Sequence, residues 1–494
     1  MMDLRRPRAR GTTLDKDLDK LGYVEEATAF VSRSLLSVGF GLLFLVLTGS
    51  LAAVFVVDSP HWVLLSAALV IGGYMALNIG ANDVANNVGP AVGARVLTMT
   101  SALALAALCE SAGALLAGSE VVTTISTRIV APGGFATPLD LAFVMLAALV
   151  AAALWINLAT VIGAPVSTTH SIVGAVVGAG VAAAGPQVVD WSTVGAIAAT
   201  WVISPLAGAL AAALLLAFVS AVIFERADRQ AAAQVWLPVL FGAMAGTFAL
   251  YLVLVGLPRV GDEVTLLQDV AIAGVAAFGA WALARPWVVR ALRDLQARDR
   301  ALKHLFRVPL IAAAAILSFA HGANDVANAV GPVAAIVSGL TGVEAEAAGV
   351  LWLLPVLLVG ALGISLGLLL FGPRLVHMVG ERITRLNPMR AFCVALATAA
   401  TVLTASGAGL PVSSTHIVVG AVFGVGFYRE WNANRSRLRR LRAGHGGAMD
   451  PVEGRRRRLV RRAHVLTIVS AWCITFPLSG LLAAAVWHLF ALVR

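Results

Sequence analysis

The sequence predicts an all-α polytopic membrane protein built from two inverted repeats. Hydrophobic residues make up 59% of the 494 residues and charged residues only 13%, and the mean hydropathy is +0.89. A water-soluble domain of this length does not need such a composition. Polar motifs inside apolar stretches recur in the second half of the chain in the same order, which predicts the repeat.

The apolar segments set the number of membrane crossings. About 12 or 13 of them approach the length of roughly 20 residues that a helix needs to span a bilayer. They lie at 35–57, 62–94, 100–118, 139–162, 163–184, 190–224, 236–257, 269–284, 308–338, 350–371, 391–408, 409–427 and 465–493. The chain is expected to comprise a cytoplasmic segment (1–34), an extra transmembrane helix (35–57), a first repeat (62–224), linking helices with a basic loop (225–307) and a second repeat (308–493).

Two motifs carry the duplication. The decapeptide GANDVANNVG at 80–89 recurs as GANDVANAVG at 322–331, and a proline follows each copy. PVSTTH at 165–170 recurs as PVSSTH at 411–416. Asp and Asn are costly in hydrocarbon, so a chain that carries them twice in register is expected to use them.

The helices that contain these motifs are expected to be irregular. The stretches 62–94 and 308–338 are too long for one straight span, and they combine Gly, Asn and Asp with Pro90 or Pro332. Each is predicted to be a discontinuous helix with an unwound middle. The PVS segments read as helix starts, because proline suits the first turn and Ser or Thr suits the cap. The segments 163–184 and 409–427 could be full spans or parts of hairpins.

Charge predicts the orientation. Arginines crowd into the loops 285–307 and 428–463, which the positive-inside rule places in the cytoplasm. Threading the spans then puts the C-terminus outside and gives the two repeats opposite orientation, from which alternating access can arise. This distribution also argues that the net charge of +10 does not reflect nucleic-acid binding. The N-terminus lacks the pattern of a signal peptide.

Other classes of protein are disfavoured. The three cysteines lie in apolar runs, without the spacing of a disulfide framework or a metal site. The sequence shows no nucleophile–base pair, nucleotide-binding loop or metal cluster, which argues against an enzyme. A channel is disfavoured because inverted repeats with midplane carboxylates suit alternating access.

The Asp and Asn residues of the decapeptides are candidates for binding a coupling cation. Asp83 precedes Asn86 by three residues and Asp325 precedes Asn328 in the same way, which places both side chains of each pair on one helix face. With free backbone carbonyls they would form an oxygen cage for a small hard cation or a proton. Capping of a half-helix is the alternative. Glu110 adds an intramembrane carboxylate, whose counterpart in the second half is apolar, near Leu362.

The PVS segments suggest an anion site. Hydroxyl groups next to unpaired N–H groups at a helix N-terminus bind anions, and two such ends facing each other would hold a tetrahedral oxyanion at mid-membrane. Since no Arg or Lys lies in the motifs, co-bound cations would supply the positive charge. The alternative is that these residues are ordinary helix caps. The candidates for substrate binding are Ser167, Thr168, Thr169, Ser413, Ser414, Thr415, Asn82 and Asn324.

The segments GANDVANNVGP, GANDVANAVGP, PVSTTHSIVGA and PVSSTHIVVGA resemble the duplicated signature of the PiT family of inorganic phosphate transporters. The resemblance covers roughly 62–224 and 308–493. It implies an inverted-repeat symporter that moves phosphate with sodium ions or protons, a site lined by the motif Asp and Ser/Thr residues, and a role for Glu110. The family often has a second Glu where this chain has Ala395, which fits a proton-coupled carrier or one that takes a metal–phosphate complex.

The expected function is therefore a secondary active symporter that imports inorganic phosphate across the plasma membrane by alternating access. Protons, with phosphate free or as a metal–phosphate complex, are favoured over sodium as the coupling ion, and no cofactor is expected. A carrier of sulfate or of another tetrahedral oxyanion is the alternative function. The implied partners are phosphate, a coupling cation and the lipid bilayer, with a second copy of the chain as a further candidate.

Overall fold

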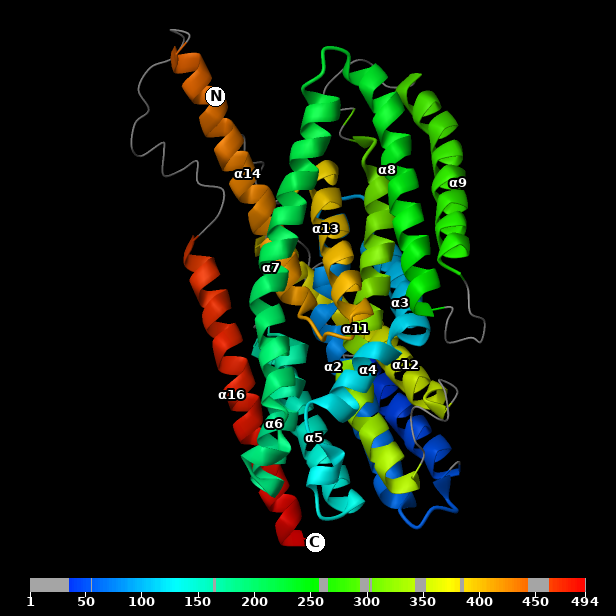
Figure 1. Cartoon of the computed structure of the whole chain (residues 1–494), viewed down its shortest axis with the longest axis vertical. Coiled ribbons are helices and arrows are strands. Elements are labelled where there is room, and N and C mark those ends of the chain that lie inside the picture. Colours follow the sequence, from blue (N-terminus) through cyan, green and yellow to red (C-terminus); the bar gives the residue numbers. More distant parts are fainter. Residues whose placement is uncertain are drawn as a thin grey trace, which may run out of the picture.

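A computed structural model of the chain shows a bundle of long helices (Figure 1). It describes residues 35–54, 56–162, 166–256, 265–293, 302, 304–342, 352–382, 386–442 and 462–493. Within these ranges the structure contains no strand, and one isolated β-bridge joins Val130 to Val189. Eleven of the described helices are long and apolar enough to cross a bilayer, so the all-α polytopic membrane fold is confirmed. The predicted segment 1–34 lies outside the described residues.

The helices follow the predicted order. The helix Leu35–Val54 comes first. The first half then contains α2 (Trp62–Gly93), α3 (Met99–Ala117), α4 (Ser119–Thr123), α5 (Pro138–Ile162), α6 (Thr168–Ala184) and α7 (Trp191–Val219). The helices α8 (Arg229–Tyr251) and α9 (Leu266–Arg293) link the halves. The second half contains α11 (Arg307–Thr341), α12 (Leu354–Arg382), α13 (Pro388–Gly407), α14 (Ser414–Arg442) and α16 (Arg462–Val493).

The predicted unwinding of the two motif helices is wrong. Both α2 and α11 are continuous α-helices through their GANDVAN segments, and Pro90 and Pro332 lie inside them. The motif glycines serve close packing instead of a break. A Cβ on Gly80 would lie 2.0 Å from the carbonyl oxygen of Ile364, and one on Gly322 would lie 2.0 Å from that of Glu110. The polar side chains find partners in neighbouring segments, so unwound backbone is not needed to satisfy them.

The irregular backbone lies at the PVS motifs, where two helical hairpins turn. Residues 166–167 precede α6 and residues 408–413 precede α14 without helical structure. Ile129 and Ala131, ahead of α5, exchange backbone hydrogen bonds with Asp190 and Val188, which follow α6. The α5–α6 pair therefore starts and ends on one side of the bundle. Figure 1 shows α13 and α14 forming the matching hairpin from the opposite side.

The two halves are intertwined, because helices of one half pack on helices of the other. Gly174 of α6 meets the carbonyl of Phe476 in α16, and Gly420 of α14 meets the carbonyl of Pro205 in α7, each at a distance that leaves no room for a Cβ. Small residues of this kind let helix backbones approach closely in a membrane. The hairpin of each half is thus held by the last helix of the other half.

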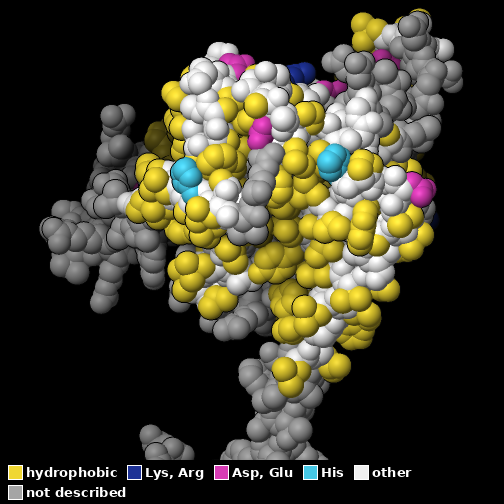
Figure 2. All heavy atoms as spheres, turned by 90° about the horizontal axis from the view of Figure 1, so that it is seen from below, with side chains coloured by type: hydrophobic (Ala, Val, Ile, Leu, Met, Phe, Trp, Pro, Cys, Tyr) yellow, Lys and Arg dark blue, Asp and Glu magenta, His cyan; other side chains and the backbone are white. Residues whose placement is uncertain are grey.

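The basic helix ends gather on one side of the bundle. The arginines Arg285, Arg290 and Arg293 lie in the last turns of α9, at the end of the bundle where α14 also ends (Figure 1). The predicted loop 428–463 begins as helix, because α14 continues to Arg442. Figure 2 shows the opposite face, where Lys and Arg side chains are scarce among the described residues.

On that opposite face Asp190 caps the N-terminus of α7. Its carboxylate accepts hydrogen bonds from Ser192 and Thr193, and these bonds lower the pKa of Asp190 to about 2. The cap is therefore ionised at physiological pH, and its negative charge interacts favourably with the N-terminal end of the helix dipole.

Candidate functional site

The predicted site residues come together in the buried centre, where the two hairpin tips meet α2 and α11. Asp83 accepts a hydrogen bond from Thr168 Oγ1 at 3.0 Å and one from Thr415 Oγ1 at 3.1 Å. Asp325 accepts one from Ser414 Oγ at 3.0 Å, and it lies 3.5 Å from Thr169 Oγ1, whose hydroxyl is closer to the carbonyl of Val412, at 3.1 Å. Each aspartate thus binds one hydroxyl from the hairpin of its own half and one from the other hairpin.

The first asparagine of each motif fixes the hairpin tip beside it. Asn82 donates to the carbonyl of Val166 at 3.2 Å, and Asn324 donates to that of Val412 at 2.7 Å. The side-chain oxygens of these asparagines accept from Thr160 and Ser406 in turn. The tips have lost their helical hydrogen bonds, and these side chains replace part of them.

The second asparagine of each motif stays on the same face as its aspartate, as the spacing predicts. Asn86 donates to Asp83 Oδ1 and to Thr415 Oγ1, at 3.1 and 2.8 Å. Asn328 donates to Asp325 Oδ1 at 3.1 Å and to Thr169 Oγ1 at 3.3 Å. Amide, carboxylate and hydroxyl groups of both halves therefore form one network.

The first Ser of each PVS motif is a helix cap, as the alternative interpretation holds. Ser167 Oγ accepts from the N–H of His170 at 3.2 Å, and Ser413 Oγ accepts from that of His416 at 3.4 Å. The hydroxyls that follow are used differently, since those of Thr168 and Ser414 donate to the aspartates. The first N–H groups of α6 and α14 have no acceptor within their own helices, and such helix starts favour an anion beside them.

Glu110 lies on α3 beside this network, and His321 of α11 lies between Glu110 and the aspartates of the network. Asn87 donates to Glu110 Oε1 at 2.6 Å, while Glu110 Oε2 is 3.2 Å from His321 Nδ1. His321 Nε2 is 2.7 Å from Asp325 Oδ2 and 3.9 Å from Asp83 Oδ2. The two aspartates and His321 are fully buried, and Glu110 is 1% exposed.

The cluster carries three carboxylates and one imidazole. In the described part of the chain, the ion pairs of these carboxylates are all made with His321. Buried carboxylates are costly without positive partners, so the site as it stands favours a cation. Donor atoms of Asp83, His321 and Asp325 lie within 4.8 Å of one another. The 2.7 Å contact between His321 and Asp325 is shorter than the usual spacing of two donors around one metal ion, and it is an ion pair when the imidazole is protonated.

His321 and Asn87 are site residues that the sequence motifs do not predict, although a signal for His321 exists. His321 directly precedes the second decapeptide and lies four residues before Asp325, on the same helix face. An ionisable residue inside an apolar stretch is by default a functional candidate. Asn87 is the one position where the first decapeptide is polar and the second is not.

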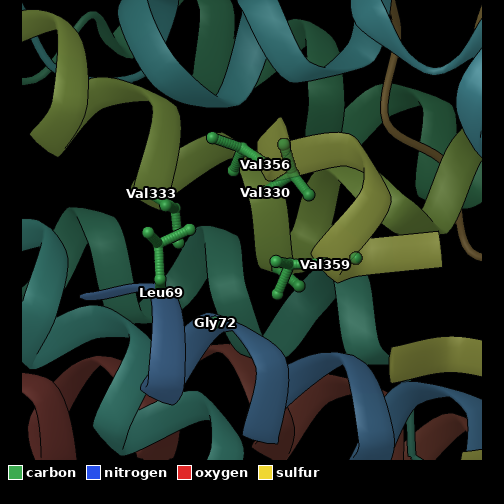
Figure 3. A pocket seen from close by; sticks show the side chains of 8 residues that line it. Leu69, Gly72, Val330, Val333, Val356 and Val359 are labelled. Carbon is green, nitrogen blue, oxygen red and sulfur yellow. The ribbon is translucent and has the colours of Figure 1, made fainter. Parts of the chain in front are cut away.

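A separate crevice between α2, α11 and α12 does not suit an anion (Figure 3). It is lined by Leu69, Gly72, Ala329, Val330, Val333, Val356, Val359 and Gly360. No side chain in this lining donates a hydrogen bond, so the crevice is an apolar seam between helices of the two halves.

Comparison with known proteins identifies similar chains. The model of a family described as "Phosphate transporter family" matches residues 79–483. A protein named "Putative phosphate permease" from Helicobacter pylori is 42% identical over 520 residues, which cover 95% of this chain and 97% of that protein. "Inorganic phosphate transporter 2-1, chloroplastic" from Arabidopsis thaliana is 34% identical, covering 86% of this chain and 72% of the other. A solved structure named "The sodium-dependent phosphate transporter" matches with a TM-score of 0.77 and 34% identity, over 87% of this chain and 100% of that one.

Proposed function

Because the chain belongs to the phosphate transporter family, whose members are transporters and not enzymes, we propose that it imports inorganic phosphate across the plasma membrane as a proton-coupled symporter. The observation that supports this most strongly is the reciprocal bonding of the aspartates. Asp83 and Asp325 each bind hydroxyls from both hairpin tips. A change at either carboxylate therefore affects both ends of the candidate anion site.

Phosphate would bind between the two tips. The N-termini of α6 and α14 supply N–H groups with favourable dipoles, and the hydroxyls of Thr168, Thr169, Ser414 and Thr415 supply further donors. Asn82 and Asn324 hold the tips in position through the carbonyls of Val166 and Val412. This set of donors surrounds an oxyanion without a Lys or Arg.

Coupling would follow from competition for the same hydroxyls. In the structure Thr168, Thr415 and Ser414 donate to carboxylates, and a hydroxyl has one hydrogen to donate. A cation that neutralises a carboxylate weakens its demand for these hydrogens and frees them for phosphate. Without that cation, the anion would enter a buried centre that already holds three carboxylates. Phosphate and cation therefore favour each other's binding.

Transport would use the inverted arrangement of the halves. The α5–α6 hairpin enters from one side of the bundle and the α13–α14 hairpin from the other (Figure 1). Each hairpin contributes an equivalent set of donors to one central site. Movement of one hairpin relative to α2 and α11 would expose the site to one side, and movement of the other hairpin to the opposite side.

Uptake by purified protein in lipid vesicles tests this function. We expect radiolabelled phosphate to accumulate when a pH gradient, acidic outside, is imposed in sodium-free medium. Unlabelled phosphate should inhibit this uptake, whereas the same concentration of sulfate should not. A parallel arm with an added divalent metal ion shows whether a metal–phosphate complex is preferred. Uptake that requires sodium and ignores the pH gradient would show that sodium is the coupling ion. Vesicles that take up sulfate in preference to phosphate would contradict the substrate.

A further inference from the structure

The tightest backbone contacts align the two halves residue by residue. Gly322 lies against the carbonyl of Glu110, and Gly80 lies against that of Ile364. Since Gly80 and Gly322 are equivalent in the decapeptides, Glu110 and Ile364 are equivalent too. A second pair of contacts agrees, because Gly113 meets the carbonyl of Phe319 and Gly367 meets that of Leu77.

This alignment shows where the inverted symmetry fails. The hydroxyls, asparagines and aspartates of the central network have counterparts in both halves. The residues that extend the network toward α3 have no polar counterparts. Asn87, Glu110 and His321 correspond to Ala329, Ile364 and Ile79, and all six are buried. Of the two symmetry-related interfaces, the one formed by α2, α3 and α11 is therefore polar, whereas its counterpart, formed by α11, α12 and α2, is apolar. We call Asn87, Glu110 and His321 the polar arm.

The contacts in the polar arm favour one proton more than a neutral histidine carries. His321 Nδ1 faces Glu110 Oε2 at 3.2 Å, and Nε2 faces Asp325 Oδ2 at 2.7 Å. An unprotonated ring nitrogen and a carboxylate oxygen would meet lone pair to lone pair at such distances. A neutral imidazole has one hydrogen and ionised carboxylates have none. One additional proton, on His321 or on a carboxyl group that contacts it, would turn both contacts into attractive ones.

Charge, more than hydrogen-bond alignment, would hold such a proton. The two ring nitrogens and Glu110 Oε2 have no well-aligned hydrogen-bond partner, and the contacts act as ion pairs. The charged groups around the ring come from three helices: Asp83 from α2, Glu110 from α3 and Asp325 from α11. The proton thus reaches the central network through Asp325, while Glu110 is anchored by Asn87.

We propose that Glu110 and His321 form a proton-binding site, present at only one of the two symmetry-related interfaces between the halves, that carries the coupling proton of each transport cycle. This inference rests on the proposed phosphate symport and names where its coupling ion binds. The proton enters on the outward-facing form, is shared between His321 and the carboxylates while phosphate is bound, and leaves from Glu110 or His321 to the cytoplasm. The apolar counterpart around Ile364 limits this route to a single proton-binding arm.

The decisive experiment separates phosphate exchange from net transport. Exchange of labelled for unlabelled phosphate at equal pH on both sides needs no release of the proton, whereas accumulation driven by a pH gradient does. Glu110→Gln keeps the size of the side chain and an oxygen for Asn87, but it cannot release a proton. We expect this variant to retain exchange in vesicles and to lose accumulation. His321→Gln is expected to show the same separation.

A matched control is available at a buried carboxylate outside the site. Asp269 lies on α9 and is 6% exposed, and Asp269→Asn makes the same chemical change without touching the polar arm. We expect it to retain exchange and accumulation. In wild-type vesicles an internal pH-sensitive dye should report proton entry with phosphate in sodium-free medium, after correction for protons released by phosphate itself. This measurement of protons per phosphate uses the wild-type protein, so its outcome does not depend on whether a variant folds.

The outcomes separate this inference from the proposed function. A wild-type protein that neither exchanges nor accumulates phosphate would overturn the function. A wild-type protein that shows net phosphate uptake in sodium-free medium without proton entry would overturn the proton site alone. Full pH-driven accumulation by Glu110→Gln would also overturn the proton site. Loss of exchange in both correctly folded variants would overturn it too, because it would show that the polar arm takes part in phosphate binding.

Discussion

Single residues in this protein serve two partners, which is how one site can couple two ions. The hydroxyl of Thr415 donates to Asp83 and accepts from Asn86, while the helix that begins beside it provides donors for an anion. In the proposed mechanism such residues would contribute to cation and anion binding at once. Mutations at them should therefore change affinity for both ions, in contrast to mutations of hydroxyls that bind only their own helix.

The serines of the second hairpin tip provide the first prediction. Replacing both Ser413 and Ser414 with Ala should raise the phosphate concentration that half-saturates uptake. A lost hydrogen bond to a charged group costs about 1.5–3 kcal/mol, which corresponds to roughly tenfold or more in affinity. Thr404→Ala is the control, since its hydroxyl is exposed and donates to Ala400 in the same helix. Unchanged kinetics in the double variant would remove these serines from the phosphate site.

The two aspartates provide the second prediction. Asp83→Asn and Asp325→Asn keep the size of the side chain and one acceptor oxygen but remove the charge. Because both aspartates contact the two tips in equivalent ways, each variant should lose gradient-driven accumulation while some phosphate binding survives. Uptake assays and equilibrium binding on the same preparations check this. Wild-type accumulation in both variants would exclude a role in coupling.

At the scale of elements, the sequence predicts the positions of the membrane-spanning helices better than the places where their backbone is irregular. The periodic apolar segments give the spans, and the duplicated motifs give the residues of the site. The same Gly, Asn and Asp content wrongly predicts unwound helices, since glycine in a sequence can mean either a break or a close contact. Only the position of Ile364 and Glu110 against Gly80 and Gly322 decides between the two. The link from His321 to Glu110 likewise depends on packing between α3 and α11, which no sequence spacing reveals.

Glycine substitution tests the interpretation of α2 as a continuous, closely packed helix. Gly80→Ala would place a Cβ 2.0 Å from the carbonyl oxygen of Ile364, and overpacking of this kind costs about 1–3 kcal/mol or more. We expect a clearly lower midpoint of thermal unfolding for the purified protein. Gly89→Ala in the same helix meets no atom within 4 Å and should leave the midpoint unchanged. Equal midpoints for the two variants would mean that α2 and α12 are not in this contact.

At the scale of the whole molecule, the two hairpins give the protein two sides that are alike in shape but different in charge. The basic ends of α9 and α14 lie on one side, and the hairpin α5–α6 begins and ends on the other (Figure 1). The inverted repeat alone does not state which side faces the cytoplasm. The arginines predict that their side faces the cytoplasm, since positive residues near the ends of spans resist export.

Labelling of single cysteines decides this orientation. In a background that lacks Cys109, Cys393 and Cys473, Asn434→Cys reports on the basic end of α14 and Gln187→Cys on the exposed turn after α6. A membrane-impermeant maleimide should modify position 187 in intact cells, and position 434 only after the cells are permeabilised. The opposite pattern would reverse the whole bundle, because both residues lie in helical segments whose relative placement is fixed by packing. It would also exchange the roles of the hairpins, so that α13–α14 and not α5–α6 would open toward external phosphate.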